Sequence, residues 1–270
     1  DGASLVMDAR GREITRAAQF QDDLLLADLT PAQLGRGSVH RRAHGRVPVT
    51  VTVPGHSAER PPLPVEPARR LGAVEEVYDA LTVGLRDYVR KNGFSTVVLG
   101  LSGGIDSSLT ACLAVDALGS DHVMGVVMPS RYSSTGTQTD AHRLAEALGI
   151  EVQEISIEPI FQACLNTLAP VFSGREPDIT EQNLQARIRG NLLMALSNKF
   201  GWLVLTTGNK SEMATGYTTL YGDMAGGFAV IKDVPKMLVY ALATFRNRRG
   251  PSSPIPGSVL TRVPTAELAP

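Results

Sequence analysis

Between residues 71 and 206, short apolar runs alternate with longer segments whose apolar residues recur at helical spacing. Continuous apolar runs are typical of buried parallel strands, and the alternation predicts helices over both faces of their sheet. The sequence therefore predicts an α/β fold with a doubly wound parallel sheet. Strands are expected at 97–101, 123–128, 151–155 and 202–206, and helices at 71–91, 109–115, 137–148, 160–171 and 180–200, the last capped by Thr180.

The beginning of the chain has a different pattern. Alternation around Gly11 predicts a β-hairpin at 4–16, and the Leu-rich run 23–29 predicts a third strand. Three strands without a helix are too few for an independent core. Residues 36–68 are rich in proline and predict a linker, with at most an edge strand at 47–53 because Pro48 lacks a backbone donor.

The linker contains a basic heptamer at 40–46, a composition that also occurs in nucleic-acid-binding segments. It has no aromatic residue on which a base could stack, so a solvated linker is the favoured interpretation. The chain is 43% hydrophobic and 20% charged, with a formal net charge of −1, which is ordinary globular composition. We therefore expect no nucleic-acid partner.

No apolar run reaches the roughly 18 residues of a membrane span, so we expect no membrane association. Two cysteines, Cys112 and Cys164, lie in apolar segments of helical character. They are expected to be buried free thiols rather than a disulfide or a nucleophile. This cysteine usage predicts a cytoplasmic protein.

The strongest chemical signal is the loop Ser-Gly-Gly-Ile-Asp-Ser, residues 102–107, between a predicted strand and a predicted helix. Gly103 and Gly104 lack a Cβ, so a phosphate can approach the backbone N–H groups closely. Asp106 would repel that phosphate by roughly 4 kcal/mol at about 4 Å and an effective dielectric near 20. A divalent cation between them reverses the sign, which favours Asp106 as a magnesium ligand.

The loop is not a Walker loop, because no Gly-Lys-Ser/Thr follows, and it lacks the spacing of a dinucleotide fingerprint. It resembles the pyrophosphate loop (PP-loop) of the ATP pyrophosphatase superfamily. Those enzymes cleave ATP between the α and β phosphates and adenylate an acceptor. The alternative is an ordinary strand–helix turn with two glycines and a serine cap.

A second group of polar motifs lies further along the chain. Asn183, Arg187 and Asn191 share one helix face, which is also the pattern of a solvated surface. Thr-Gly-Asn-Lys-Ser-Glu at 207–212 follows a predicted strand, although Thr207 and Glu212 also fit a helix cap with a first-turn acid. A Gly-rich loop with Tyr-Gly-Asp and a Lys-Asp-Val-Pro-Lys segment then end at Lys236.

From Leu71 to the C-terminal end, these motifs occur in family order and resemble those of the NAD⁺ synthetases, in particular the two-domain, glutamine-dependent variant. The resemblance implies an adenine nucleotide alpha hydrolase-like domain at 69–270, and it identifies 1–35 with the last strands of a nitrilase-like glutaminase domain. Neither cysteine lies at 1–35, so we expect no glutaminase nucleophile in this chain. Because the family usually continues beyond the equivalent of Pro270, the chain is hypothesised to be part of a longer enzyme, and the resemblance implies a homo-oligomer.

The resemblance also implies the site residues, with Asp106 and Lys236 as the catalytic pair. Magnesium is expected on Asp106 and Glu212. Deamido-NAD⁺ is expected on Asn183, Arg187, Glu212, Asp223 and Lys232, with Arg131 as a further candidate. ATP is expected on Thr207, Lys236 and the loop residues Gly100, Leu101, Ser102, Gly103, Gly104, Ile105, Asp106 and Ser107.

The implied reaction is the ATP-dependent amidation of deamido-NAD⁺ to NAD⁺ through an acyl-adenylate, with release of AMP and pyrophosphate. Ammonia is the nitrogen donor and comes from glutamine in the longer enzyme. Two alternatives stay open: another ATP pyrophosphatase, acting like GMP synthetase or on a tRNA base, and a catalytically silent nucleotide-binding domain. A tRNA-modifying enzyme is expected to show a basic, aromatic-bearing groove, which this sequence lacks.

Overall fold

The computed structural model describes residues 2–29, 61, 63, 66–250, 252–263, 265 and 267–269. The chain divides into two compact units, Asp1–Leu71 and Gly72–Pro270. The linker expected at 36–68, with its basic heptamer and its edge strand at 47–53, lies almost entirely outside the described residues. The assignment of 1–35 to a nitrilase-like domain remains a prediction.

The first unit contains an antiparallel ribbon of β1 (Leu5–Met7) and β2 (Glu13–Arg16), which confirms the predicted hairpin. The Asp8 carboxylate accepts hydrogen bonds from the backbone N–H groups of Arg10 and Arg12, at 2.8 and 2.9 Å, and so closes the turn. The third strand expected at 23–29 is wrong. The segment pairs with no strand among the residues that the structure describes, and Leu24 and Leu26 lie on the surface instead of packing into a core.

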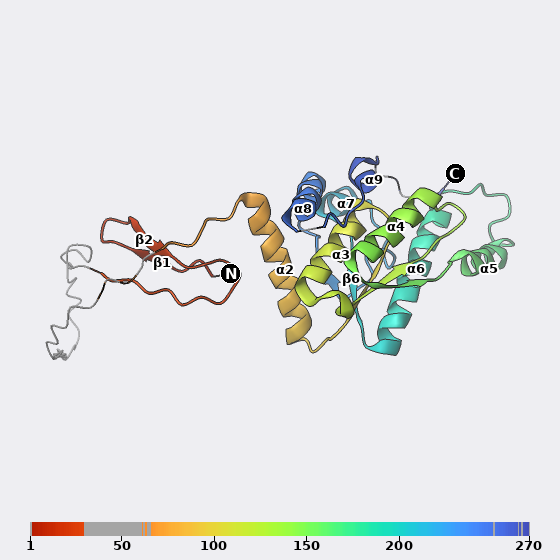
Figure 1. Ribbon diagram of the computed structural model, residues 1–270. Coiled ribbons are helices and arrows are strands. Elements are labelled where there is room, and N and C mark those ends of the chain that lie inside the picture. The colour runs from red at the N-terminus through yellow and green to blue at the C-terminus, as the bar shows by residue number, and fades with distance from the viewer. Residues whose placement is uncertain are drawn as a thin grey trace, which may run out of the picture. The chain divides into compact units, whose positions relative to one another are not determined.

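The second unit is built on a five-stranded parallel sheet in the order β5-β4-β3-β6-β7. Figure 1 shows β6 of this sheet among the surrounding helices. Four of these strands confirm the predicted runs, and the two-residue β7 is too short to leave a periodic signal in the sequence. The strands are β3 (Val97–Gly100), β4 (Val123–Val127), β5 (Glu151–Glu154), β6 (Leu203–Thr206) and β7 (Phe228–Ala229).

Helices cover both faces of this sheet, as the doubly wound prediction requires. Alternate residues of β3 enter different cores: Val97 and Leu99 pack with one set of helices, and Val98 packs with the other. The first set is α2 (Ala73–Lys91), α3 (Ile105–Leu118), α4 (Thr135–Leu148), α8 (Lys236–Arg249) and the short α9 (Gly257–Thr261). The second set is α5 (Glu158–Leu168) and α6 (Ile179–Phe200).

Helices α6, α4 and α3 begin earlier than predicted, and in α6 and α4 a polar side chain caps the first turn. Helix α6 begins with a capping box of Asp178 and Glu181, so Asp178 is the cap and Thr180 is not. Ser134 caps α4 and accepts a hydrogen bond from the Thr137 N–H at 3.2 Å, which starts that helix at Thr135. Helix α3 already begins at Ile105, so Asp106 lies in its first turn.

Both cysteines are free thiols, as expected. Cys112 is fully buried in α3, where burial raises the pKa of its thiol to about 12, but Cys164 is only half-buried. Among the residues that the structure describes, none of the helices has the length and apolar character needed to cross a bilayer.

Candidate active site

A cavity of about 450 Å³ opens at the carboxyl ends of β3 and β6. β3 and β6 are neighbours in the sheet. The chain continues from β3 to β4 and β5 on one side of β3, and then returns to form β6 on the other side, so the loops that follow β3 and β6 lead away from each other. Ligands of open α/β sheets bind at such a switch point. The predicted residues that line the cavity are all eight from Gly100 to Ser107, together with Thr207, Glu212, Asp223 and Lys236.

The glycine loop is folded tightly against α4. Gly103 has a φ of +74°, and a Cβ placed there would lie 2.0 Å from the Thr137 carbonyl oxygen, so no other residue fits without moving the loop. The Ser102 and Ser107 hydroxyl groups lie 3.0 Å apart and hydrogen-bond to each other, and the Gly104 N–H donates to the Ser102 Oγ at 3.2 Å. These contacts define the conformation of the loop in the structure.

The N-terminus of α3 faces this cavity. The Ser108 N–H donates to the Gly104 carbonyl at 3.1 Å, so the N–H groups of 105–107 lie in the turn that has no acceptor within the helix. Together with the helix dipole, such groups form an anion site. This geometry suits a phosphate chain.

Asp106 is the centre of a polar cluster inside the cavity. Its Oδ2 pairs with the Lys236 ammonium group, and its Oδ1 accepts a hydrogen bond from the Asn209 Nδ2 at 2.8 Å. Asn209 is fully buried, and it also caps α7 (Lys210–Thr215) in a capping box with Glu212. Asn209 therefore ties the two predicted magnesium ligands to each other.

Acidic groups crowd this part of the cavity. Burial raises the pKa of the Glu212 carboxyl group, although the hydrogen bond from the Asn209 N–H opposes this shift, and the nearby negative charges of Asp106 and Asp223 raise the pKa further. Within the described ranges, no three His, Cys, Asp or Glu residues form a complete metal site. Two carboxylates are nevertheless a usual set of protein ligands for Mg²⁺ when phosphate oxygens and water occupy its other coordination positions. The donor set fits magnesium bound together with a nucleotide.

Sequence reasoning missed several residues of this site, among them Asn209 and Arg189. Asn209 was detectable, because Asn followed three residues later by Glu is a capping-box pattern. Arg189 lines the cavity and donates from Nε to the Met128 carbonyl at 3.1 Å. Burial lowers the pKa of its guanidinium group, while the charge of Asp223 raises it. The face of α6 chosen from the sequence, which carries Arg187, is not the face that carries Arg189.

The remaining predicted residues lie outside the cavity. Asn183 accepts a hydrogen bond from the Thr219 hydroxyl group at 2.8 Å, and the Arg187 Nε donates to the Leu220 carbonyl at 3.2 Å, so both hold the Gly-rich loop on α6. Arg187 also lines a second hollow, of about 500 Å³, with Tyr221. Lys232 follows β7 and lines neither hollow.

Arg131 is the other candidate that lies outside the cavity. Its guanidinium group pairs with Glu158 and donates to the Gln162 Oε1 at 2.7 Å, which engages it with α5. A role of Arg131, Lys232, Asn183 or Arg187 toward a dinucleotide remains a prediction.

Comparison of the sequence with known proteins supports the resemblance found in the sequence analysis. Residues 77–270 match the family model described as NAD synthase. A Thermotoga maritima protein named glutamine-dependent NAD(+) synthetase is 52% identical over 283 residues, which cover 100% of this chain and 48% of that protein. An Aquifex aeolicus protein of the same name is 47% identical over 279 residues, with 100% and 48% coverage. The chain spans about half the length of the curated relatives it matches.

Solved structures agree. A glutamine-dependent NAD+ synthetase from Acinetobacter baumannii in complex with ADP superposes with a TM-score of 0.72 at 51% identity, over 73% of this chain and 38% of that chain. The NMN synthetase of Francisella tularensis superposes with a TM-score of 0.66 at 29% identity, over 73% of this chain and 77% of that chain. Both similarities cover the larger part of this chain.

Proposed function

This chain belongs to the NAD synthase family, and we propose that the protein containing it amidates deamido-NAD⁺ to NAD⁺ at the expense of ATP. The observation that carries the proposal is the convergence of Asp106, Glu212 and Lys236 beside the glycine loop at the start of α3. A buried set of two acids and one ammonium group next to an anion site suits a magnesium–triphosphate complex.

In the first chemical step, the nicotinate carboxylate of deamido-NAD⁺ attacks the α-phosphorus of ATP, and pyrophosphate leaves. The attacking carboxylate is already ionised, so the site needs no general base and acts by positioning and charge stabilisation. The backbone N–H groups of α3 and the Lys236 ammonium group hold the phosphates. When bound by Asp106 and Glu212, magnesium supplies further positive charge to the phosphate oxygens.

In the second step, ammonia attacks the acyl carbon of the adenylate, AMP leaves with the bonding electrons of the acyl–oxygen bond, and the attacking nitrogen loses one proton to water to give the amide. We further propose that this ammonia comes from glutamine in the whole protein, because the relatives are named glutamine-dependent. We also propose that the whole protein is a homo-oligomer in the cytoplasm.

The function is tested by measuring AMP release and amide formation with the full-length protein, ATP, magnesium and ammonium. Deamido-NAD⁺ is compared with xanthosine monophosphate, unmodified tRNA and nicotinate mononucleotide, the last because one structural neighbour is an NMN synthetase. We expect stoichiometric AMP and NAD⁺ with deamido-NAD⁺ alone. AMP release that depends on another acceptor would replace the proposed substrate, and no AMP release with any acceptor would indicate a silent nucleotide-binding protein.

Lys236 provides a sharper test of the mechanism. Its ammonium group forms an ion pair with Asp106, so Lys236→Met removes a positive charge from the anion site. We expect kcat to fall by at least about 10² because a charge-stabilising donor is lost, and the unfolding temperature to fall as well because Asp106 loses its ion-pair partner. The surface variant Lys91→Met, on α2, is the matched control, and equal activity of the two variants would rule out the role of Lys236.

A further inference from the structure

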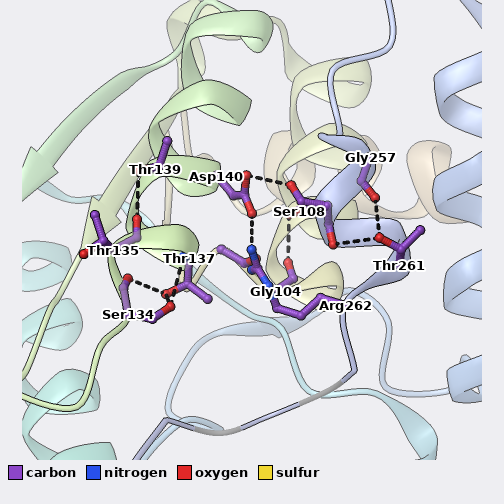
Figure 2. A network of polar contacts seen from close by, with 12 residues as sticks. Gly104, Ser108, Ser134, Thr135, Thr137, Thr139, Asp140, Gly257, Thr261 and Arg262 are labelled. Carbon is purple, nitrogen blue, oxygen red and sulfur yellow. Dashed lines mark hydrogen bonds and ion pairs between the residues drawn. The ribbon is translucent and has the colours of Figure 1, made fainter.

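The residues that follow α9 form one wall of the cavity, and Arg262 is the first of them. Its guanidinium group pairs with the Asp140 carboxylate of α4 and also donates to the Gly103 carbonyl oxygen at 3.3 Å. Figure 2 shows the Arg262 side chain reaching Asp140 beside Gly104. One side chain therefore joins the end of the chain, α4 and the glycine loop.

Asp140 is placed to orient this arginine. Its side chain is 4% exposed, and its second oxygen accepts a hydrogen bond from the Ser258 hydroxyl group at 2.8 Å. A buried carboxylate is strongly destabilising without a partner, so the pairing of Asp140 with Arg262 fixes where the guanidinium group lies. The Nη1 atom of the same guanidinium group is then directed at the glycine loop.

The contact with Gly103 controls one peptide plane. In a trans peptide the carbonyl and the following N–H point in opposite directions. The Gly103 carbonyl points to Arg262, and the Gly104 N–H donates to the Ser102 hydroxyl group on the other side, at 3.2 Å. Because both residues are glycines, rotation of this peptide meets little steric resistance. Rotation would turn the Gly103 carbonyl oxygen away from Arg262, would break the hydrogen bond from the Gly104 N–H to Ser102, and would change the shape of the loop that lines the cavity.

We propose that Arg262, oriented by Asp140, is a positioning residue that holds the Gly103–Gly104 peptide in the orientation that binds the triphosphate of ATP. This inference rests on the proposed function of the same cavity. Arg262 acts through the loop backbone, whereas Lys236 and Asp106 act on the phosphates and the metal.

The test uses Arg262→Met in the full-length protein, with steady-state kinetics for each substrate. We expect the KM for ATP to rise by about tenfold or more, as for the loss of a charge-assisted hydrogen bond, while the KM for deamido-NAD⁺ changes by less than about twofold. Asp140→Asn is expected to raise the KM for ATP in the same direction. In Arg262→Ala, added guanidinium ion at millimolar concentration should lower the KM for ATP again.

Arg246→Met is the matched control. Arg246 pairs with Asp116 and is 14% exposed, so this variant also breaks a largely buried arginine–carboxylate pair, but between α8 and α3. We expect it to lower the unfolding temperature with an unchanged KM for ATP. If Arg262→Met changes only stability, as Arg246→Met does, or if guanidinium does not restore ATP use, Arg262 is structural and the proposal is wrong.

The outcomes separate this inference from the proposed function. If the wild-type protein forms no NAD⁺, the proposed function fails, and calorimetric titration with ATP and magnesium still compares the two arginine variants. If the wild type forms NAD⁺ and Arg262→Met has a normal KM for ATP, only the inference about Arg262 fails. Arg262→Lys, which keeps the charge but cannot bridge both partners as the planar group does, should lie between the wild type and Arg262→Met.

Discussion

Gly103 and Gly93 have the same backbone conformation in different surroundings. Their φ angles are +74° and +77°, but a Cβ on Gly103 would lie 2.0 Å from a backbone oxygen of α4, whereas a Cβ on Gly93 would have no atom of the described residues within 4 Å. Conformation and crowding can therefore be separated experimentally. Both positions disfavour alanine, and only one of them also excludes it by contact.

Replacing each glycine by alanine should give different losses. Gly93→Ala is expected to lower the free energy of unfolding by about 1–2 kcal/mol, from its left-handed conformation alone, and to leave ATP binding unchanged. Gly103→Ala should also displace the loop from α4 and weaken ATP binding by about 10²-fold. Urea titration and calorimetry with ATP measure the two effects. Equal ATP affinity in both variants would show that the contact with Thr137 does not shape the site.

Residues with a local signature could be found from the sequence, and residues defined by distant contacts could not. The glycines, serines and Asp106 of the loop form a continuous motif, and all of them line the cavity. Arg262 lies 159 residues from Gly103, its partner in the loop, so no spacing pattern relates the two. The role of Arg262 becomes visible only when the sheet and α4 bring the two segments together.

At the scale of elements, a buried polar contact connects three helices of one layer. Tyr78 of α2 is fully buried and donates from its hydroxyl group to Asp116 of α3 at 2.6 Å. Arg246 of α8 donates to both oxygens of the same carboxylate, at 2.7 and 2.9 Å. Burial and the negative charge of Asp116 raise the pKa of the Tyr78 hydroxyl group, so it remains a donor at neutral pH.

Tyr78→Phe tests this connection. The substitution keeps the ring but removes the donor from a charged acceptor, and we expect a loss of about 1–3 kcal/mol in the free energy of unfolding. Tyr88→Phe is the control on the same helix, since the Tyr88 hydroxyl donates to a carbonyl at 3.3 Å from an exposed position. We expect less than about 0.5 kcal/mol there. Similar losses would mean that the ring, and not the contact with Asp116, holds α2 in place.

Helices and strands with a regular spacing of apolar residues were predictable from the sequence, and elements defined by their neighbours in space were not. The four longer core strands and the amphipathic α2 follow directly from apolar spacing. The two-residue β7 is defined by its pairing with β6, and Leu-rich residues 23–29 pair with none of the described strands. Composition alone does not contain this information.

At the scale of the whole molecule, the second unit carries both hydrophobic cores and the described lining of the cavity. We therefore expect a fragment spanning Gly72–Pro270 to unfold in one cooperative transition and to bind ATP with magnesium. Calorimetric unfolding with and without ATP measures both properties. A fragment that shows no cooperative transition would mean that the first 71 residues are needed for the fold of the second unit.

The crossing of the sheet between β5 and β6 also has a consequence for synthesis on the ribosome. Asp106 meets Asn209 and Lys236 across 103 and 130 residues, and its loop meets Arg262 across 159. Contacts over such separations form late, after most of the chain has emerged. A nascent chain that ends before β6 has the glycine loop but none of these partners. We therefore expect nucleotide binding to begin only after this unit is almost completely translated and folded.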